Sequence, residues 1–163
     1  LGMGYLSQEP SVFRKLTVEQ NIRAILETCK MKGAERRLRL KYLLEELDLT
    51  NRAKSKAYTF SVGEKRRREI TRALVTSPKL LLLDEPLAGI DPIAQYEVSK
   101  IVRRLKERGL GILITDHSAR EMLKLVDRAY LIHKGEVVYA GDAARMAEGP
   151  KAREIYLGPE FNM

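Results

Sequence analysis

Residues 80–86 read Leu-Leu-Leu-Leu-Asp-Glu-Pro, an apolar run that ends in two adjacent carboxylates, Asp84 and Glu85. A run this short fits either a buried strand or a turn of buried helix. Two charges at its end are unfavourable unless a cation meets them, which favours a buried parallel strand that presents one carboxylate to Mg²⁺ and the other to a reacting water. The alternative is a strand end followed by an ordinary proline turn.

From Pro78 onward, short apolar segments alternate with helical periodicity. This alternation is typical of βαβ units on a parallel sheet and predicts an α/β fold. Gly109 is expected to end the long helix, and Lys134-Gly135 to form a hairpin turn. The predicted strands are 79–84, 110–115, 128–133 and 136–140, and the predicted helix is 92–108 with Val98, Ile101, Val102 and Leu105 facing inward.

Before Pro78 the pattern is mostly helical. A short strand is expected at 3–7, followed by helices within 17–76 that begin at an N-cap, Thr17. Short helices are also expected over 118–126, after Asp142 and over 150–157. Leucines at helical spacing, expected to face the core, are Leu40, Leu43, Leu44 and Leu47.

The composition is that of a single globular domain, with 163 residues and 44% hydrophobic content. No apolar run reaches the roughly 18 to 20 residues needed to span a bilayer, and no signal-type segment is present. The single cysteine, Cys29, excludes a disulfide within the chain and is in register with the apolar face of the first helix, so we expect it to pack in the core. This cysteine usage suits a cytosolic protein.

The net charge of +8 and the basic run at 65–68 raise the question of nucleic-acid binding. The run opens a predicted helix, and no aromatic residue interleaves with it to stack on bases. We interpret it as a solvated charged helical face and expect no nucleic-acid partner. A basic surface that faces anionic lipid head groups is a further alternative.

Four other segments accompany the 80–86 strand in a fixed order. They read Gly-Tyr-Leu-Ser-Gln-Glu at 4–9, Phe-Ser-Val-Gly-Glu at 60–64, Ala-Gly-Ile-Asp at 88–91 and Ile-Thr-Asp-His at 114–117. Together these segments resemble the Q-loop, signature, D-loop and switch histidine of ABC transporter ATPases. The resemblance implies a P-loop NTPase fold of the ABC type, three-layered α/β, with a helical subdomain over about 8–77 and the remainder of the core over 78–163.

The resemblance also implies the roles of individual residues. Glu85 would polarise the attacking water and His117 would contact the γ-phosphate, although a lone histidine after a strand is more often structural. The cofactors implied are ATP and Mg²⁺, with two ATP molecules held between the subunits of a head-to-tail homodimer. Asp84 and Gln8 are the candidates for Mg²⁺, and the candidates for nucleotide contact are Gln8, Ser61, Gly63, Glu64 and Asp91.

Two departures from the family pattern stand out. No Gly-x-x-x-x-Gly-Lys-Ser/Thr segment occurs, although the P-loop precedes the Q-loop in this family. We therefore interpret the chain as the C-terminal part of one nucleotide-binding domain, lacking its N-terminal strands and P-loop, and expect it to be inactive and poorly stable by itself. Val62 stands where the family has glycine, and its β-branched side chain restricts the backbone near the expected phosphate.

Three segments narrow the resemblance. Together with 114–117, residues 11–18, 87–92 and 155–161 resemble the ATPases of lipopolysaccharide export transporters, and the ATPases of branched-chain amino acid importers are the alternative. The resemblance implies membrane permease subunits as partners and a peripheral location on the cytoplasmic face of the inner membrane. Phe13 and Arg14 would line the groove for the permeases' coupling helices; otherwise Phe13 would be a staple at a helix entrance.

Two other classes of protein remain as alternatives. A non-transport ABC protein of DNA repair or translation would carry inserted zinc, coiled-coil or linker segments, which this sequence does not contain. A non-catalytic remnant remains as the second alternative, because the missing P-loop would supply the main phosphate ligands.

Overall fold

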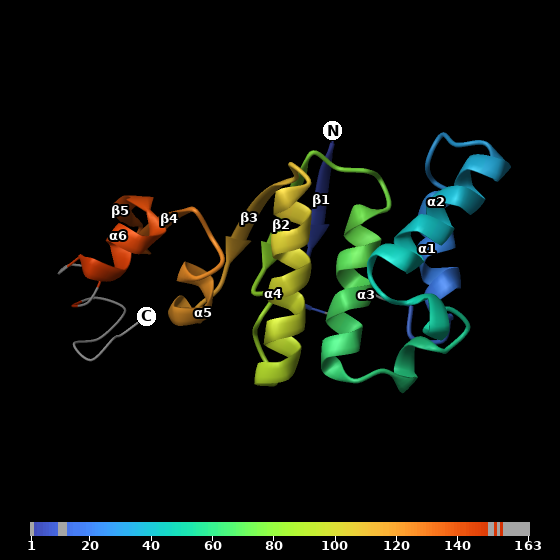
Figure 1. The fold of residues 1–163 in the computed structure, drawn as a ribbon, viewed down its shortest axis with the longest axis horizontal. Coiled ribbons are helices and arrows are strands. Elements are labelled where there is room, and N and C mark those ends of the chain that lie inside the picture. Colours follow the sequence, from blue (N-terminus) through green and yellow to red (C-terminus); the bar gives the residue numbers. More distant parts are fainter. Residues whose placement is uncertain (1, 10–12, 150–151, 153, 155–163) are drawn as a thin grey trace. The chain divides into compact units, whose positions relative to one another are not determined.

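A computed structural model describes residues 2–9, 13–149, 152 and 154. The chain forms two compact units, Leu1–Thr115 and Asp116–Met163, shown in Figure 1. The predicted boundary between a helical subdomain and the remaining core, at 77–78, lies inside the first unit and stays a prediction.

The first unit contains a parallel sheet of three strands in the order β1-β2-β3. The strands are β1 (Met3–Leu6), β2 (Leu80–Asp84) and β3 (Gly111–Thr115). The apolar run at 80–84 is thus a parallel strand, as predicted, and it lies in the middle of this sheet. Within the described part of the first unit, β3 pairs only with β2, which leaves its other edge without a strand.

The two faces of this sheet differ in burial. Leu81 and Leu83 point into the core and are almost completely buried, because side chains alternate along a strand. On the opposite face Tyr5, Leu82 and Leu113 lie in one row, since these residues are register partners. Tyr5 is 59% exposed and Leu113 is 54% exposed, so this face is an uncovered apolar surface in the described part of the unit.

Four helices accompany the sheet (Figure 1). They are α1 (Val18–Leu26), α2 (Gly33–Glu46), α3 (Val62–Leu74) and α4 (Pro92–Glu107), with short 3₁₀ turns at Thr50–Arg52 and Ala57–Thr59. Thr17 is confirmed as the N-cap of α1, since its hydroxyl accepts the Gln20 N–H while the Gln20 side chain accepts the Thr17 N–H. The four leucines predicted to face the core, on α2 and at its C-cap, and the four inward residues on α4 are all buried.

The helix α4 begins and ends where the sequence predicts. The Asp91 carboxylate accepts the N–H groups of Ile93 and Ala94, and Pro92 occupies the first helical position, where its missing N–H is harmless. Gly109 adopts a φ of +82°, a conformation that allows the chain to leave the helix at little steric cost.

The second unit is a small α/β cluster. It contains α5 (Ala119–Leu123), the antiparallel pair β4 (Arg128–His133) and β5 (Glu136–Asp142), and α6 (Ala143–Glu148). Its core consists of Leu123, Leu131, Ala143, Met146 and Ala152.

The predicted hairpin turn of this unit is confirmed. Lys134 and Gly135 have φ values of 50° and 84°, which is the type I′ geometry that matches the twist of a hairpin. α5 is shorter than the predicted 118–126 helix. The segment 155–161 and most of the helix predicted over 150–157 lie outside the described residues.

Two expectations about individual side chains need correction. The basic run at 65–68 is not a solvated face, because Arg66 is only 6% exposed and Arg68 is fully buried. Arg68 donates to the Ala57 carbonyl at 3.1 Å and lies over the Phe60 ring, and burial lowers the pKa of Arg68. Cys29 lies beyond the end of α1 and is only partly buried.

No helix among the described residues is both long enough and apolar enough to cross a membrane.

Candidate nucleotide-hydrolysis site

The candidate site lies where β2 ends. Asp84 is the last residue of β2, and each oxygen of its carboxylate accepts a hydrogen bond from a hydroxyl group on a neighbouring strand. The Thr115 hydroxyl donates to Oδ1 at 2.7 Å, and the Tyr5 hydroxyl donates to Oδ2 at 3.2 Å. Desolvation, the hydrogen bond to Asp84 and the negative charge of Asp84 raise the pKa of the Tyr5 phenol, so it stays protonated and donates at neutral pH.

Glu85 follows Asp84 in an unusual backbone conformation. Its φ is +44°, in the left-handed region that bulky residues rarely adopt. Its N–H donates to the Thr115 carbonyl at 2.8 Å, and its carbonyl accepts from the buried guanidinium of Arg66 at 2.5 Å. The backbone is therefore held on both sides, and the side chain is displayed beyond the strand end.

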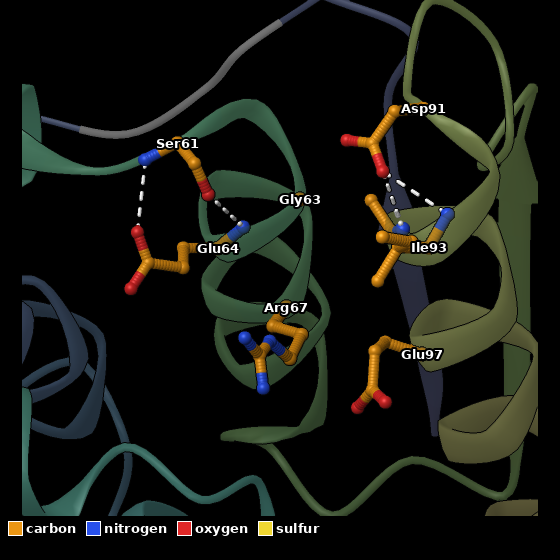
Figure 2. A pocket seen from close by; sticks show the side chains of 8 residues that line it. Ser61, Gly63, Glu64, Arg67, Asp91, Ile93 and Glu97 are labelled. Atoms are coloured by element: carbon orange, nitrogen blue, oxygen red, sulfur yellow. Dashed lines mark hydrogen bonds between the residues drawn. The ribbon is translucent and has the colours of Figure 1, made fainter.

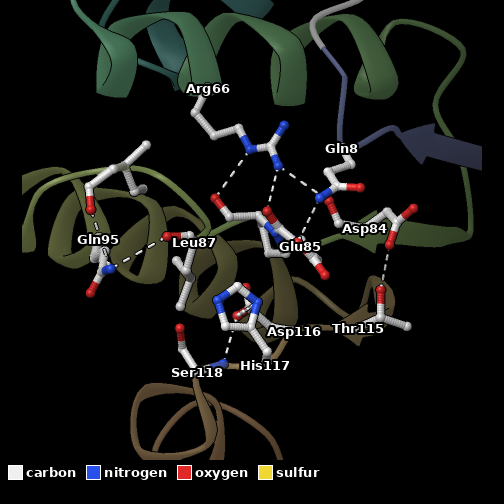
Figure 3. Close-up of polar contacts among 12 residues, drawn as sticks. Gln8, Arg66, Asp84, Glu85, Leu87, Gln95, Thr115, Asp116, His117 and Ser118 are labelled. Atoms are coloured by element: carbon white, nitrogen blue, oxygen red, sulfur yellow. Dashed lines mark hydrogen bonds and ion pairs between the residues drawn. The ribbon is translucent and has the colours of Figure 1, made fainter.

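Gln8 lies beside Glu85, although 77 positions separate them in sequence. The Gln8 Nε2 donates to Glu85 Oε2 at 2.8 Å (Figure 3). The Gln8 carbonyl oxygen keeps its acceptor capacity. The carboxyl ends of parallel strands meet at one edge of a sheet, which is why the ends of β1 and β2 bring these side chains together.

The oxygen donors at this edge suit Mg²⁺. Magnesium prefers oxygen ligands and binds through one or two carboxylates together with substrate phosphates. Asp84 and the amide oxygen of Gln8 would supply such ligands. Among the described residues no three His, Cys, Asp or Glu side chains gather into a metal site.

The segment at 60–64 forms the start of α3. Ser61 is the N-cap: its hydroxyl accepts the Glu64 N–H at 3.3 Å, and the Glu64 carboxylate accepts the Ser61 N–H at 2.9 Å. Val62 is the first residue of the helix, so its backbone adopts a conformation that needs no glycine. Arg52 also pairs with Glu64 at 3.5 Å.

Gly63 is needed for packing between two helices. A Cβ at Gly63 would lie 2.6 Å from the Ala94 Cβ, closer than real carbon atoms approach. The starts of α3 and α4 therefore touch at this point. Beside this contact lies a pocket that is lined by residues of the signature segment and by Asp91, the N-cap of α4.

This pocket is open and small, about 150 Å³ (Figure 2). Small-molecule sites usually enclose roughly 300–1,000 Å³, so this pocket alone cannot enclose a nucleotide. Its lining residues are Ser61, Gly63, Glu64, Arg67, Asp91, Ile93, Ala94 and Glu97. The carboxylates among these residues would repel a phosphate group. The groups in the pocket that favour an anion are therefore Arg67 and the helix N-termini.

The remaining predicted residues lie elsewhere. Phe13 is 54% exposed, with the Arg72 guanidinium over its ring at 5.5 Å, and Arg14 is exposed. The buried Asn21 side chain holds this segment through the Phe13 N–H and carbonyl, so Phe13 is not a buried staple. His117 belongs to the second unit, two positions after Thr115, with its Nδ1 3.9 Å from Asp116 Oδ1.

Sequence reasoning missed two residues that shape the site. Gln95 donates to the carbonyls of Leu87 and Ile90 and so braces the turn after Glu85. Arg66 donates to the carbonyls of the Glu85 turn. Its position offered a signal, because it precedes the buried Ile70 by four residues and so lies on the inward face of α3.

We expect the substitution Gly63→Ala to lower the free energy of unfolding by about 1–3 kcal/mol, since the added methyl group overpacks the contact with Ala94. Ala94→Gly should restore part of the loss in the double variant, because it removes the opposing methyl group. Urea unfolding of the full-length gene product with the single and double substitutions measures this coupling. Strictly additive losses would show that the two helices do not touch here.

Glu64 should contribute to acid sensitivity. Partial burial alone would raise the pKa of Glu64, but the Ser61 hydrogen bonds and the charges of Arg52 and Arg67 outweigh it and lower this pKa below its ordinary 4.5. A lowered folded-state pKa gives stabilisation that is present above pH 4.5 and is lost as the pH falls through the folded value. Glu64→Gln keeps the capping geometry seen at Gln20, so the urea midpoint of the full-length gene product with this substitution should fall less steeply with acid than that of the wild type. Parallel acid dependences would contradict this assignment.

Comparison with known proteins agrees with the geometry. The family model described as ABC transporter matches residues 1–88. The lipopolysaccharide export system ATP-binding protein LptB of Acidithiobacillus ferridurans is 47% identical over the whole chain, which spans 68% of that protein. An uncharacterised ABC transporter ATP-binding protein of Rhizobium meliloti is 51% identical over the whole chain, which spans 60% of its length.

A solved structure with a similar fold is also an ATP-binding cassette. A dimeric ATP-binding cassette in a post-hydrolysis state, bound to ADP and Pi, superposes with a TM-score of 0.72 at 25% identity, covering 86% of this chain and 62% of the other. The sequence and structure comparisons thus agree on the family and on the fold. The chain belongs to the ATP-binding proteins of the ABC transporter family.

Proposed function

We propose that this chain supplies the hydrolytic half of an ABC ATPase site in which Gln8, Asp84 and Glu85 act on Mg-ATP. The observation that carries the proposal is the hydrogen bond between Gln8 and Glu85 at the strand edge where Asp84 also lies. Bound Mg²⁺ would neutralise phosphate charge, with Asp84 and Gln8 as its protein ligands. Glu85 would accept a hydrogen bond from the attacking water and orient it toward the γ-phosphate, while Gln8 fixes the carboxylate.

The signature segment would act on a nucleotide held by a second subunit. Its pocket is too small for ATP and is built around the N-terminus of α3, which favours anions. Closure of two subunits head to tail would place the Ser61 side chain and the α3 amides at the phosphates of the other subunit's ATP. Asp91 would lie at the same interface, and His117 would sense the γ-phosphate.

We propose lipopolysaccharide export as the transport process, with permease subunits that contact the exposed Phe13 and Arg14 at the cytoplasmic face of the inner membrane. Support comes from the 47% identity to the Acidithiobacillus ferridurans protein. A branched-chain amino acid importer is the competing assignment. The full-length gene product should restore growth to a Gram-negative strain depleted of its own lipopolysaccharide-export ATPase, and Phe13→Ala should weaken this rescue. Failure of rescue alongside successful rescue by the Acidithiobacillus relative would contradict the assignment.

The activity itself is tested by phosphate release from Mg-ATP by the full-length gene product. We expect hydrolysis that requires Mg²⁺. Asp84→Asn should reduce it, because a neutral amide replaces the carboxylate and is a weaker ligand for the metal. Hydrolysis that is equally fast in Asp84→Asn would place the reaction elsewhere.

A further inference from the structure

The guanidinium of Arg66 binds four backbone carbonyls around the candidate site, and Figure 3 shows the guanidinium above Asp84 and Glu85. Its Nε donates to Pro86 at 3.1 Å and its Nη1 to Ser7 at 3.0 Å. Its Nη2 donates to Asp84 at 3.2 Å and to Glu85 at 2.5 Å. One side chain thus holds the whole turn that displays Glu85 and also holds the residue that precedes Gln8.

Arg66 is itself fixed on α3. Its Nη1 forms an ion pair with Glu69 at 3.1 Å, and both side chains are almost completely buried. The pair lies in the second and third turns of the helix whose N-cap is Ser61. The guanidinium therefore connects α3, here called the signature helix because it begins in the signature segment, to the two backbone segments that carry Gln8 and Glu85.

The backbone at Glu85 needs this connection. A left-handed φ is unfavourable for a residue with a long side chain and persists only where the surroundings hold it. Arg66 supplies charge-assisted hydrogen bonds to the carbonyls at 84, 85 and 86. Without these donors the turn can relax, and the Glu85 carboxylate moves relative to Gln8.

We propose that Arg66 is a positioning residue for ATP hydrolysis, which sets Glu85 against Gln8 and makes their geometry depend on the place of the signature helix. This inference rests on the proposed function. It predicts that a shift of α3, such as closure onto a second subunit would impose, is transmitted to Glu85 by one buried side chain.

Lysine is the informative replacement. An ammonium group keeps the charge beside Glu69, so Arg66→Lys should fold, but it cannot direct a planar fork of donors to several carbonyls. We expect a fall in kcat of about 10²-fold with the KM for ATP changed by less than about threefold, because a displacement near 1 Å is enough to cause such a loss. Arg66→Gln should lower kcat at least as much.

The decisive measurement combines these variants with Glu85→Gln in the full-length gene product. If Arg66 acts through Glu85, Arg66→Lys lowers kcat in the wild-type background and leaves the residual rate of Glu85→Gln unchanged. A purely structural role would lower both rates by the same factor and overturn the proposal, as would wild-type kcat in Arg66→Lys. Arg103→Gln, an exposed arginine on α4, is the matched control and should keep wild-type kcat.

The same measurements separate this proposal from the proposed function. If wild-type and Glu85→Gln proteins hydrolyse ATP at the same rate, Glu85 is not the group that orients water and the proposed function fails. If Glu85→Gln is slow and Arg66→Lys is fast, the proposed function stands and the role of Arg66 is wrong.

Discussion

Replacement of Glu85 by glutamine is expected to lower steady-state ATP hydrolysis by the full-length gene product by about 10²- to 10⁴-fold, the usual contribution of a group that acts as a general base. The amide oxygen can still accept the hydrogen bond from Gln8, so the local geometry should survive. What is lost is the negative charge that polarises the attacking water. Phosphate release measures the rate.

The same variant should accumulate as a dimer with two bound ATP molecules, because binding continues while hydrolysis stops. Size-exclusion chromatography with Mg-ATP measures the dimer. Glu107→Gln, which neutralises an exposed carboxylate at the end of α4, is the control. It should hydrolyse ATP like the wild type and should not accumulate as the ATP-bound dimer. A Glu85→Gln protein that hydrolyses at the control rate, or stays monomeric with ATP, would contradict the assigned role.

Residues 1–163 by themselves are expected to bind Mg-ATP with a Kd weaker than about 1 mM. The sequence contains no Gly-x-x-x-x-Gly-Lys-Ser/Thr loop, and so it lacks the backbone N–H groups and lysine that carry most of the phosphate binding in this class of site. Isothermal titration of the purified chain measures this affinity. Micromolar binding would show that the described residues already form a complete nucleotide site.

The same chain should aggregate or unfold without a sharp transition. Tyr5 and Leu113 expose an apolar sheet face, and one edge of β3 carries no strand in the described part of the first unit. Leu113→Thr keeps β-propensity while it removes apolar surface, so this variant should aggregate less in light scattering and bind ATP no better. A soluble wild-type monomer with one cooperative thermal transition would contradict the expectation.

Periodicity was sufficient to predict most of the fold. The inward face of α4, the cap at Thr17 and the turn at Lys134-Gly135 depend on residues that are close in sequence, so local rules predict them. The basic run at 65–68 was predicted wrongly for the opposite reason. The carbonyls that Arg66 binds lie 18 to 59 positions away, so the local spacing that places Arg66 on the inward face of α3 does not reveal the partners that allow its charge to be buried.

The same distinction applies to the candidate site. Strand ends at one sheet edge account for the meeting of Gln8 and Glu85. From the sequence, only the family resemblance assigned both residues to one site, because a lone glutamine after a strand carries no signal. The contact between Gly63 and Ala94 could not be predicted, because it depends on how closely α3 approaches α4. The roles of His117, Phe13 and Arg14 stay predictions, and so does the trans action of Ser61.

The central claim is that ATP is hydrolysed between the Glu85 edge of one subunit and the signature segment of another. The most direct test is an experimental structure of the full-length Glu85→Gln protein with Mg-ATP. We predict two ATP molecules at the interface of a homodimer, Mg²⁺ held through Asp84 and Gln8, and Ser61 of the partner subunit on the γ-phosphate. Nucleotide bound away from Asp84 and residue 85, or lacking any contact from a second subunit, would contradict the claim.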